Sequence, residues 1–365
     1  MKKTIAIVLA LIMTIGLLSA CGSTSSATTT TAAATTAAAA TTAASGDTTA
    51  AAETTAGTQA VEYKWTAAIH LPDTTTHTQA VQYFADELAE KSNGRIQVTV
   101  SSAGALGSQR EIIEAVNLGT IEIGFGECGV YANYDDVFGV LNLPFLFSDY
   151  DQLFAACDGD MGKYYESKLQ EVTNLKILNW MNGGARMIYS TKPLTTWDDL
   201  TNLKIRTPES SVYVSTFKAL GCNPTPIAMT EVYSSLQQGV VEAMEGTLES
   251  GVSYKMYEVC TDMLESRHIF ADCQLVINED LYNSLPDDIK AIVDECAADT
   301  QTWQRAKWAE NEEGYVTQLK DAGMQIHEID NTEAKAKMES FYKEYIGGES
   351  DKQEVFDMIQ SVTSK

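Results

Sequence analysis

The chain has 365 residues, of which 44% are hydrophobic, and 50 Asp and Glu against 25 Lys and Arg give a formal net charge of −25. An acidic balance of this size favours solubility and excludes a nucleic-acid-binding protein, which needs a basic face for the phosphates. The length is sufficient for a large core or for two lobes.

The N-terminus has the features of an export signal. Lys2 and Lys3 precede an apolar run, and small residues then lead to the tetrapeptide LSAC, which ends at Cys21. This order is typical of a secretory signal, and its end resembles the lipobox of bacterial lipoproteins, which implies cleavage after residue 20 and a lipid on Cys21. The alternatives are a transmembrane anchor and a signal that is cut elsewhere. We therefore expect residues 1–20 to be a signal peptide and the protein to be lipid-anchored to the cell membrane, outside the cytoplasm.

Residues 21–60 form a low-complexity segment. After Cys21 they are almost entirely Thr, Ala, Ser and Gly, without the apolar periodicity that a buried face requires. We expect this segment to be a disordered tether and the folded part to begin near Val61. No second apolar run reaches membrane-spanning length.

The first part of the folded region alternates strand and helix. The apolar spacing and the turn residues predict a strand at 63–69, a helix within 74–94, a strand at 95–100, a helix at 108–119 and a strand at 121–125. This alternation predicts an α/β lobe with a mostly parallel sheet, in which ligands bind beyond the carboxyl ends of the strands.

A second α/β pattern follows a stretch of loops and short helices. The expected elements are strands at 175–180, 185–190 and 203–206, a helix at 210–221, a helix at 230–239 capped by Thr230, and a strand at 240–244. From Pro286 onward the pattern is helical, apart from a strand at 324–329. We therefore predict a two-lobed fold with a ligand cleft between the lobes. Its parts are a first lobe at 61–183, a second lobe at 184–271, and at 272–365 a crossover segment with long C-terminal helices that pack on both lobes.

The familiar catalytic and cofactor motifs are missing. The run GFGECG at 124–129 matches GxGxxG, but the long helix that a dinucleotide site requires does not follow it. Its glycines instead suggest that the backbone approaches a ligand closely. The sequence contains neither GxSxG nor HExxH, so we predict no catalytic residues, no cofactor and no metal site. An enzyme remains an alternative because catalytic triads are assembled in space.

The histidines and cysteines leave choices open. His70 lies just past a strand end, where a ligand contact and a structural role are both compatible with the sequence, whereas His268 is most simply a packed or capping residue. Six cysteines besides Cys21 lie without a CxxC pair, several in apolar surroundings, which favours buried free thiols over disulfides. They are Cys128, Cys157, Cys222, Cys260, Cys273 and Cys296.

Two of the six arginines lie at the ends of neighbouring predicted strands. Arg186 belongs to the sequence GGAR and Arg206 to LKIR. The planar guanidinium group presents a fork of donors that matches a carboxylate, which a lysine does not. The pattern predicts that both arginines hold one ligand carboxylate between the lobes. The alternative is that they pair with acidic neighbours in the chain.

Five segments together resemble the DctP-type solute-binding proteins of tripartite ATP-independent periplasmic (TRAP) transporters. Two of them, 77–100 and 104–125, are similar to the first lobe of that family. LNLPFLFSDYDQ at 141–152 is similar to its Pro-Phe segment, and the segments 192–210 and 220–246 are similar to its second lobe. The combination, which extends from about Tyr63 to the C-terminal helices, is specific, although no single piece is.

The resemblance implies roles for individual residues. It makes Arg206 the bidentate partner of the ligand carboxylate, with Arg186 beside it. It places His70 at a polar ligand contact, Glu127 where ligand hydroxyls donate hydrogen bonds, and Met229 where a bulky side chain covers the ligand. Gly246 departs from the family, whose members often have an Asn there that helps to hold the carboxylate. The neighbouring Glu245 is compatible with a position in the site or in the hinge.

The resemblance also implies a function. Two lobes close on a small organic acid, and the closed protein delivers it to membrane subunits that are driven by an ion gradient. A carboxylate at Glu127 repels a second ligand carboxylate but accepts bonds from hydroxyls, and Gly246 adds room. Both features favour a hydroxylated monocarboxylate such as a sugar acid over a four-carbon dicarboxylate. The alternatives are a secreted lipoprotein enzyme that acts on a carboxylate substrate and a receptor of a different importer class.

Overall fold

The computed structural model describes residues 60–364. The predicted signal peptide, the lipid site at Cys21 and the tether up to residue 59 lie outside the described residues. Among the residues that are described, no helix is long and apolar enough to cross a membrane.

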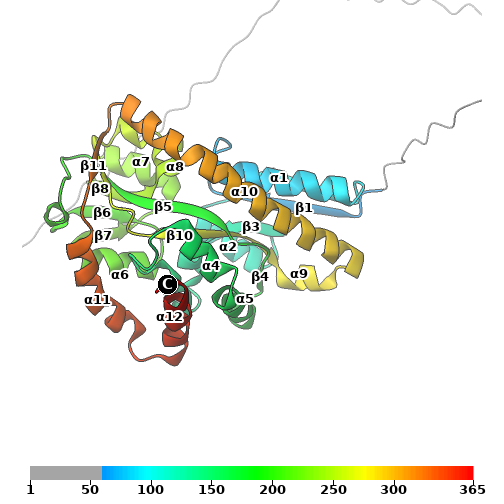
Figure 1. The fold of residues 1–365 in the computed structure, drawn as a ribbon. Coiled ribbons are helices and arrows are strands. Elements are labelled where there is room, and N and C mark those ends of the chain that lie inside the picture. The colour runs from blue at the N-terminus through cyan, green and yellow to red at the C-terminus, as the bar shows by residue number, and fades with distance from the viewer. Residues whose placement is uncertain (1–59, 365) are drawn as a thin grey trace, which may run out of the picture. The chain divides into compact units, whose positions relative to one another are not determined.

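The first lobe is built as the sequence pattern predicts (Figure 1). Its elements are β1 (Tyr63–Ala68), α1 (Thr76–Lys91), β2 (Ile96–Ser101), α2 (Gln109–Asn117) and β3 (Ile123–Gly126). The central strand β1 pairs in parallel with both β2 and β3. The hydroxyl of Thr75 caps α1, and Ser108 and Glu111 form a reciprocal capping box at the start of α2. These caps explain why both helices begin close to the predicted positions.

The second lobe repeats this arrangement. Its elements are β6 (Lys204–Thr207), α6 (Ser211–Ala219), β7 (Asn223–Pro226), α7 (Met229–Gln237) and β8 (Ala243–Thr247). Strand β6 pairs in parallel with β7 and β8. The prediction that Thr230 caps α7 was wrong, because the helix begins one residue earlier, at Met229, and Ala228 is its N-terminal flanking residue.

Two long buried strands connect the lobes. They are β5 (Met181–Ser190) and β10 (Phe270–Asn278), which pair with each other in antiparallel orientation. Strand β10 also pairs with β3 of the first lobe, and β5 with β8 of the second, both antiparallel. The sheet order along the main path is therefore β2-β1-β3-β10-β5-β8-β6-β7. The expectation of a mostly parallel sheet was wrong at these central strands, which run against their neighbours in both lobes.

The predicted lobe boundaries, 183/184 and 271/272, fall inside β5 and β10 and stay predictions. At the second of them the pairing of β10 with β5 shifts register, between Ala271 and Asp272. Three short strands complete the sheet: β4 (Leu175–Ile177), which pairs with β10, and β9 (Asp262–Glu265), which pairs with β5 and with β11 (Gln325–Glu328).

Helices cover the sheet. The shorter ones are α3 (Cys128–Tyr131), α4 (Tyr150–Cys157), α5 (Asp160–Val172), α8 (Leu248–Ser253) and α9 (Glu279–Ser284), with 3-10 turns at Asp136–Asn142, Trp197–Leu200 and Met256–Glu258. The C-terminal helices are α10 (Asp287–Asp321), α11 (Thr332–Ile346) and α12 (Ser350–Thr363). Helix α10 has 35 residues and packs on α1 of the first lobe, on β5 and on α8 of the second lobe (Figure 1). It therefore links the two lobes.

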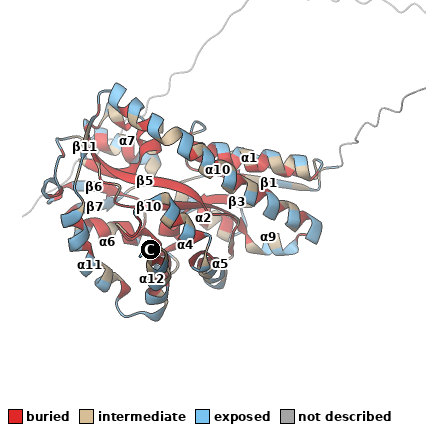
Figure 2. Cartoon of the chain, in the orientation of Figure 1, coloured by how far each residue is buried: buried red, intermediate tan, exposed pale blue. Residues whose placement is uncertain are grey.

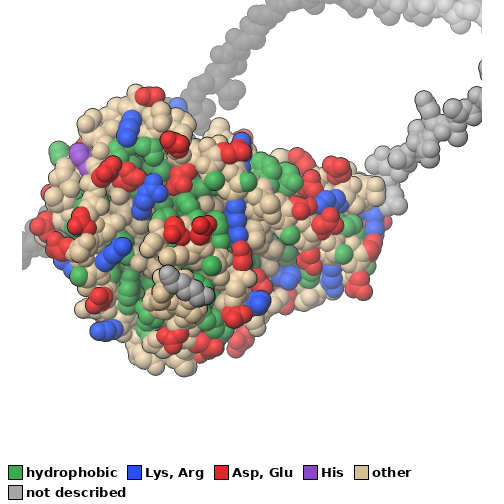
Figure 3. Space-filling view, viewed as in Figure 1, with side chains coloured by type: hydrophobic (Ala, Val, Ile, Leu, Met, Phe, Trp, Pro, Cys, Tyr) green, Lys and Arg blue, Asp and Glu red, His purple; other side chains and the backbone are tan. Residues whose placement is uncertain are grey.

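Burial and surface charge agree with the composition. The central strands are buried along their length (Figure 2). The six cysteines of the described region are all buried and free, which confirms the prediction of free thiols. On the face in Figure 3, Lys and Arg side chains lie among acidic ones rather than in a basic patch.

Candidate ligand-binding site

A cleft of about 800 Å³, open solvent included, lies where the carboxyl ends of the strands of both lobes meet. The first lobe and the crossing strands contribute His70, His77, Phe125, Glu127, Arg186 and Asp272, among others, and the second lobe contributes Arg206, Glu209, Met229, Gly246, Glu249 and Ser250. A position beyond the carboxyl ends of strands is where open α/β sheets bind ligands. Six of the seven residues that the sequence singled out for this site line the cleft, and Glu245 does not.

Arg206 presents an unoccupied fork to the cleft. Its side chain is 4% exposed, and its Nε donates a hydrogen bond of 2.7 Å to the carbonyl oxygen of Ile227. The nearest carboxylate oxygen, Oε1 of Glu245, lies 3.9 Å from Nη1. Among the described residues no acceptor lies within hydrogen-bonding distance of the two terminal nitrogens. Burial lowers the pKa of Arg206 to about 10, so the group stays cationic at neutral pH.

Arg186 is already paired. Its Nε and Nη2 donate to the two carboxylate oxygens of Glu245 at 2.5 and 2.7 Å, and Nη1 lies 3.7 Å from Oε2 of Glu127. The guanidinium group also lies 4.8 Å from the centre of the Tyr213 ring. The alternative of pairing with an acidic neighbour therefore applies to Arg186. The residue also lies in the middle of β5 and not at a strand end, because the buried residues 181–184 extend the strand.

Glu245 is the counterion of Arg186 and not part of the cleft wall. It is fully buried, and Nε2 of His268 lies 3.8 Å from its Oε2. Burial alone would raise the pKa of Glu245, but Arg186 lowers it to about 2. Of the two positions that the sequence left open for Glu245, the structure favours the one outside the cleft, because the register of β8 against β5 directs this side chain toward Arg186.

Glu127 lies at the N-terminal flank of α3. Burial raises its pKa to about 7, against the opposing effect of the Arg186 charge. Near neutral pH the group therefore divides between the acid, which donates a hydrogen bond, and the carboxylate, which only accepts. Both forms can pair with a ligand hydroxyl.

His70 is buried and neutral. Burial and then the Arg206 charge lower its pKa to about 3. The hydroxyl of Tyr254, from the second lobe, donates to the backbone carbonyl of His70 at 3.0 Å. The ring Nδ1 of His70 has no hydrogen-bond partner among the described residues. A buried polar atom of this kind favours the ligand-contact interpretation of His70.

Met229 and Gly246 complete the predicted set. Met229 begins α7 at the edge of the cleft, and Gly246 lies in β8. A Cβ atom on Gly246 would lie 2.6 Å from Cε of Met244 and 2.9 Å from Oγ of Ser250. These two atoms are too close to leave an empty site at the position that a Cβ atom of residue 246 would take. The extra room expected at Gly246 is therefore partly filled.

The sequence did not indicate His77, Glu249 and Cys273, which also line the cleft. A cysteine, a histidine and a glutamate in one cleft resemble a nucleophilic triad. However, Nδ1 of His77 lies 2.8 Å from Oε2 of Glu249, and its Nε2 lies 2.9 Å from the carbonyl oxygen of Asn182. Both partners are acceptors, so both ring nitrogens carry protons and none is free to accept the proton of Cys273. Burial also raises the pKa of that thiol.

A two-lobed α/β fold whose cleft contains a buried arginine without a carboxylate partner in hydrogen-bonding distance is the form of a binding protein for small anionic solutes. The chain belongs to the family described as bacterial extracellular solute-binding protein, family 7, whose profile matches residues 67–348. This membership confirms the family that the sequence segments indicated. Proteins of this family work outside the cytoplasm.

Three relatives illustrate the similarity. A solute-binding protein of Chromohalobacter salexigens is 31% identical over 295 residues, which are 80% of this chain and 88% of the relative. The C4-dicarboxylate-binding periplasmic protein DctP of Rhodobacter capsulatus is 31% identical over 71% of this chain and 78% of its own. The crystal structure of a TRAP periplasmic solute-binding protein from Roseobacter denitrificans, with bound β-D-glucuronate, is 31% identical. It superposes with a TM-score of 0.79 over 82% of this chain and 99% of its own.

Proposed function

We propose that this protein binds a hydroxylated monocarboxylate, such as a sugar acid, in the cleft between its lobes and delivers it to the membrane subunits of a TRAP transporter. The observation that carries the proposal is the free, buried fork of Arg206. A guanidinium group that is enclosed and unpaired attracts an anionic partner strongly, since water is excluded around it.

The balance of charge in the cleft supports one ligand carboxylate rather than two. Glu245 neutralises Arg186, and Glu249 pairs with His77. The remaining arginines and carboxyl groups of the cleft are Arg206 and Arg110 against Glu209, Asp272 and the partly ionised Glu127. A second carboxylate near Glu127 would meet an acid instead of a cation. Sequence identity alone does not decide the ligand, because the relative named for C4-dicarboxylates and the structure with glucuronate are equally similar to this chain.

We further propose that the protein holds its ligand without transforming it. The double hydrogen bonding of His77 leaves the neighbouring Cys273 without a base. Prolonged incubation of the protein with a bound sugar acid, followed by mass spectrometry, should return the acid unchanged. A product of different mass would favour the enzymatic alternative.

The proposal includes a lipid anchor at Cys21, with residues 22–60 as the tether. The support is the order of basic residues, apolar run and LSAC in the sequence. An anchored receptor on a long tether stays near its membrane partner while its cleft samples the solution.

A thermal-shift panel followed by calorimetry tests the ligand class. The panel contains D-glucuronate, D-galacturonate, D-galactonate, succinate, malate and neutral D-glucose. We expect the sugar acids to raise the melting temperature and D-glucose to leave it unchanged, because only the acids engage Arg206. A strong shift with succinate or malate and none with the sugar acids would contradict the proposed class.

A further inference from the structure

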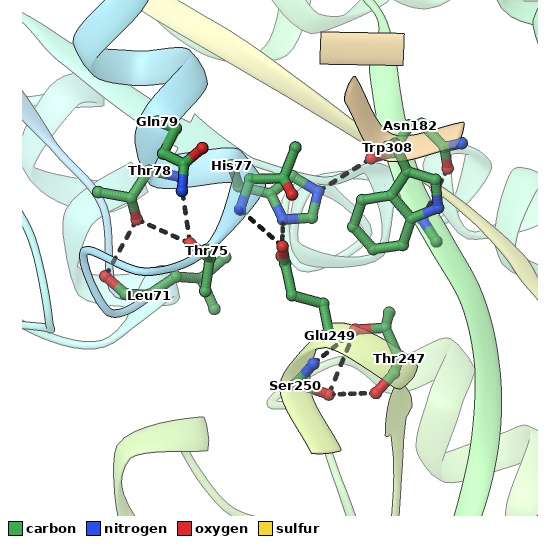
Figure 4. A network of polar contacts seen from close by, with 12 residues as sticks. Leu71, Thr75, His77, Thr78, Gln79, Asn182, Thr247, Glu249, Ser250 and Trp308 are labelled. Carbon is green, nitrogen blue, oxygen red and sulfur yellow. Dashed lines mark hydrogen bonds and ion pairs between the residues drawn. The ribbon is translucent and has the colours of Figure 1, made fainter. Parts of the chain in front are cut away.

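An ion pair joins the two lobes at the inner side of the cleft. His77 lies on α1, which follows β1 of the first lobe, and Glu249 lies on α8, which follows β8 of the second lobe. Nδ1 of His77 and Oε2 of Glu249 are 2.8 Å apart, and both side chains are 4% exposed. Figure 4 shows the two side chains meeting from opposite elements.

The remaining polar atoms of the pair are also bonded. Oε1 of Glu249 accepts from the backbone N–H of Thr76 at 2.6 Å and from the hydroxyl of Tyr315 on α10 at 2.6 Å. Nε2 of His77 donates to the carbonyl oxygen of Asn182 on the crossing strand β5 at 2.9 Å. Four elements therefore meet at this pair. Helix α1 belongs to the first lobe and α8 to the second, whereas α10 and β5 connect the two lobes.

Both members of the pair are charged. Burial alone would lower the pKa of His77, but the charge of the Glu249 carboxylate and its hydrogen bond to the ring raise it well above its usual value. Burial likewise would raise the pKa of Glu249, and His77 lowers it. Removing one partner of such a pair leaves the other as a buried, uncompensated charge. That penalty applies only while the lobes are together, because each group can be hydrated once α1 and α8 separate.

Glu249 also lies between two cavities. Glu249 and Ser253 line the ligand cleft and, on their other side, a second groove bounded by Thr74 and by Glu310 and Asn311 of α10. The side chain of Glu249, which His77 holds from the cleft side, thus forms part of the wall between them. Separation of the pair would open the cleft toward this groove.

We propose that the His77–Glu249 pair is a latch that holds the two lobes together and closes the cleft on the side of α10. It acts on ligand retention by stabilising the closed arrangement, so the two residues are positioning residues. The effect on ligand retention rests on the proposed function, whereas the effect on the lobes does not.

The latch is tested with the neutral variants His77→Gln and Glu249→Gln and with the double variant. Spin labels on Leu118→Cys and Val240→Cys report the separation of the lobes, because these positions are 76% and 55% exposed while the described native thiols are buried. Cys21→Ser in the full chain removes the remaining thiol. His327→Gln is the matched control, since His327 pairs with Asp262 at 2.8 Å between β11 and β9, away from α1 and α8.

Without ligand, each single variant should shift the label distances to longer values than in wild type. The release of D-glucuronate should become roughly thirtyfold faster or more, as expected when one partner of a buried charge pair is removed. The double variant should lie between wild type and the single variants in both measurements, because it leaves no lone charge but has also lost the ion pair. Circular dichroism and melting curves establish that each variant folds. If one single variant does not fold, the other is sufficient for the measurement of the label distances.

Label distances for both single variants that match those of His327→Gln without ligand would overturn the latch. A double variant with the label distances of wild type would overturn it too, because the pair would then contribute nothing to closure. Failure of D-glucuronate to bind wild type contradicts the proposed ligand alone, because the ligand-free distances still decide the question of the latch.

Discussion

Arg186 and Glu245 face each other across β5 and β8 through two parallel hydrogen bonds, from Nε at 2.5 Å and from Nη2 at 2.7 Å. The same carboxylate comes no closer than 3.9 Å to the guanidinium group of Arg206. One carboxylate thus satisfies the first arginine and leaves the second free. The two arginines therefore differ: under the proposed function Arg206 binds the ligand carboxylate, whereas Arg186, which also lines the cleft, is held by Glu245.

Replacement of Arg206 should weaken ligand binding most. Arg206→Ala should reduce the affinity for D-glucuronate by ~2–5 kcal/mol, the effect of truncating one partner of a buried charge pair. Arg206→Lys should also weaken binding clearly, because it keeps the charge and loses the fork. Isothermal calorimetry measures both, and the methyl ester of the ligand should show a loss similar to that of Arg206→Ala. Equal affinities in wild type and Arg206→Ala would remove this residue from the site.

Glu245→Gln should destabilise the protein by about 3–5 kcal/mol, since it leaves the buried charge of Arg186 without its full counterion. Urea unfolding measures the change. Glu333→Gln is the control, because Glu333 forms an exposed ion pair with Lys337, and exposed pairs contribute about 0–1 kcal/mol. Similar losses in the two variants would mean that the Arg186–Glu245 pair contributes no more than a surface pair.

The sequence indicated local structure better than long-range pairing. Helices α1 and α2 begin at Thr75 and Ser108, whose capping is a local property of a few residues. The partner of Arg186 lies 59 residues away, and it is selected by the register of β5 against β8, which no local pattern contains. The prediction also contained only part of β5 and did not contain β10. Both strands are buried on both faces, so their sequences lack the regular alternation of polar and apolar residues that indicates a strand.

The cleft was predicted through the family resemblance, and six of the residues that it named line the cleft, while their contacts with a ligand stay predictions. The pair of His77 and Glu249 was missed because its members are 172 residues apart and each resembles an ordinary helical residue. Only the approach of α1 to α8 brings them together.

The protonation of Glu127 should make stability depend on pH in a defined direction. Its pKa is about 7 in the folded protein against an ordinary value of 4.5, so the folded protein holds the proton more tightly than the unfolded chain does. The contribution to stability is complete below pH 4.5 and is lost as the pH rises through 7, by up to about 3 kcal/mol. Glu127→Gln should remove this loss. Relative to wild type, the variant should therefore gain stability between pH 5 and pH 8 in urea unfolding.

Glu114→Gln, at an exposed pair with Arg110, should keep the pH profile of the wild type. A constant difference between wild type and Glu127→Gln across this range would contradict the raised pKa. The same variant should keep the carboxylate anchor at Arg206 and change the ranking among hydroxylated acids. An unchanged ranking would mean that Glu127 does not contact the ligand.

The lipid anchor predicts a simple fractionation result. Cys21→Ala should leave the signal uncut or release the protein from membranes, because the alanine side chain carries no thiol for the lipid. Membrane fractionation with mass spectrometry of the N-terminus measures the outcome. Recovery of the variant as processed, lipid-linked protein in the membrane fraction would contradict the anchor at Cys21.

Gly184 on the crossing strand β5 should tolerate no side chain. Its φ is +93°, and a Cβ atom would lie 2.4 Å from Cζ2 and 2.7 Å from Cη2 of the Trp308 ring. That ring is fully buried on α10 and lies 5.0 Å from the ring of His77. Gly184→Ala should therefore combine backbone strain with overpacking, for a total loss of roughly 2–6 kcal/mol in urea unfolding.

Gly239→Ala separates the two contributions, because Gly239 has a φ of +70° and no atom within 4 Å of its would-be Cβ. It should cost only the backbone strain, on the order of 1–3 kcal/mol. Gly184→Ala should also weaken the binding of D-glucuronate, because a displaced Trp308 disturbs His77, whereas Gly239→Ala should leave binding unchanged. Equal losses of stability in the two variants, with unchanged binding in both, would mean that the Trp308 ring moves aside without affecting the cleft.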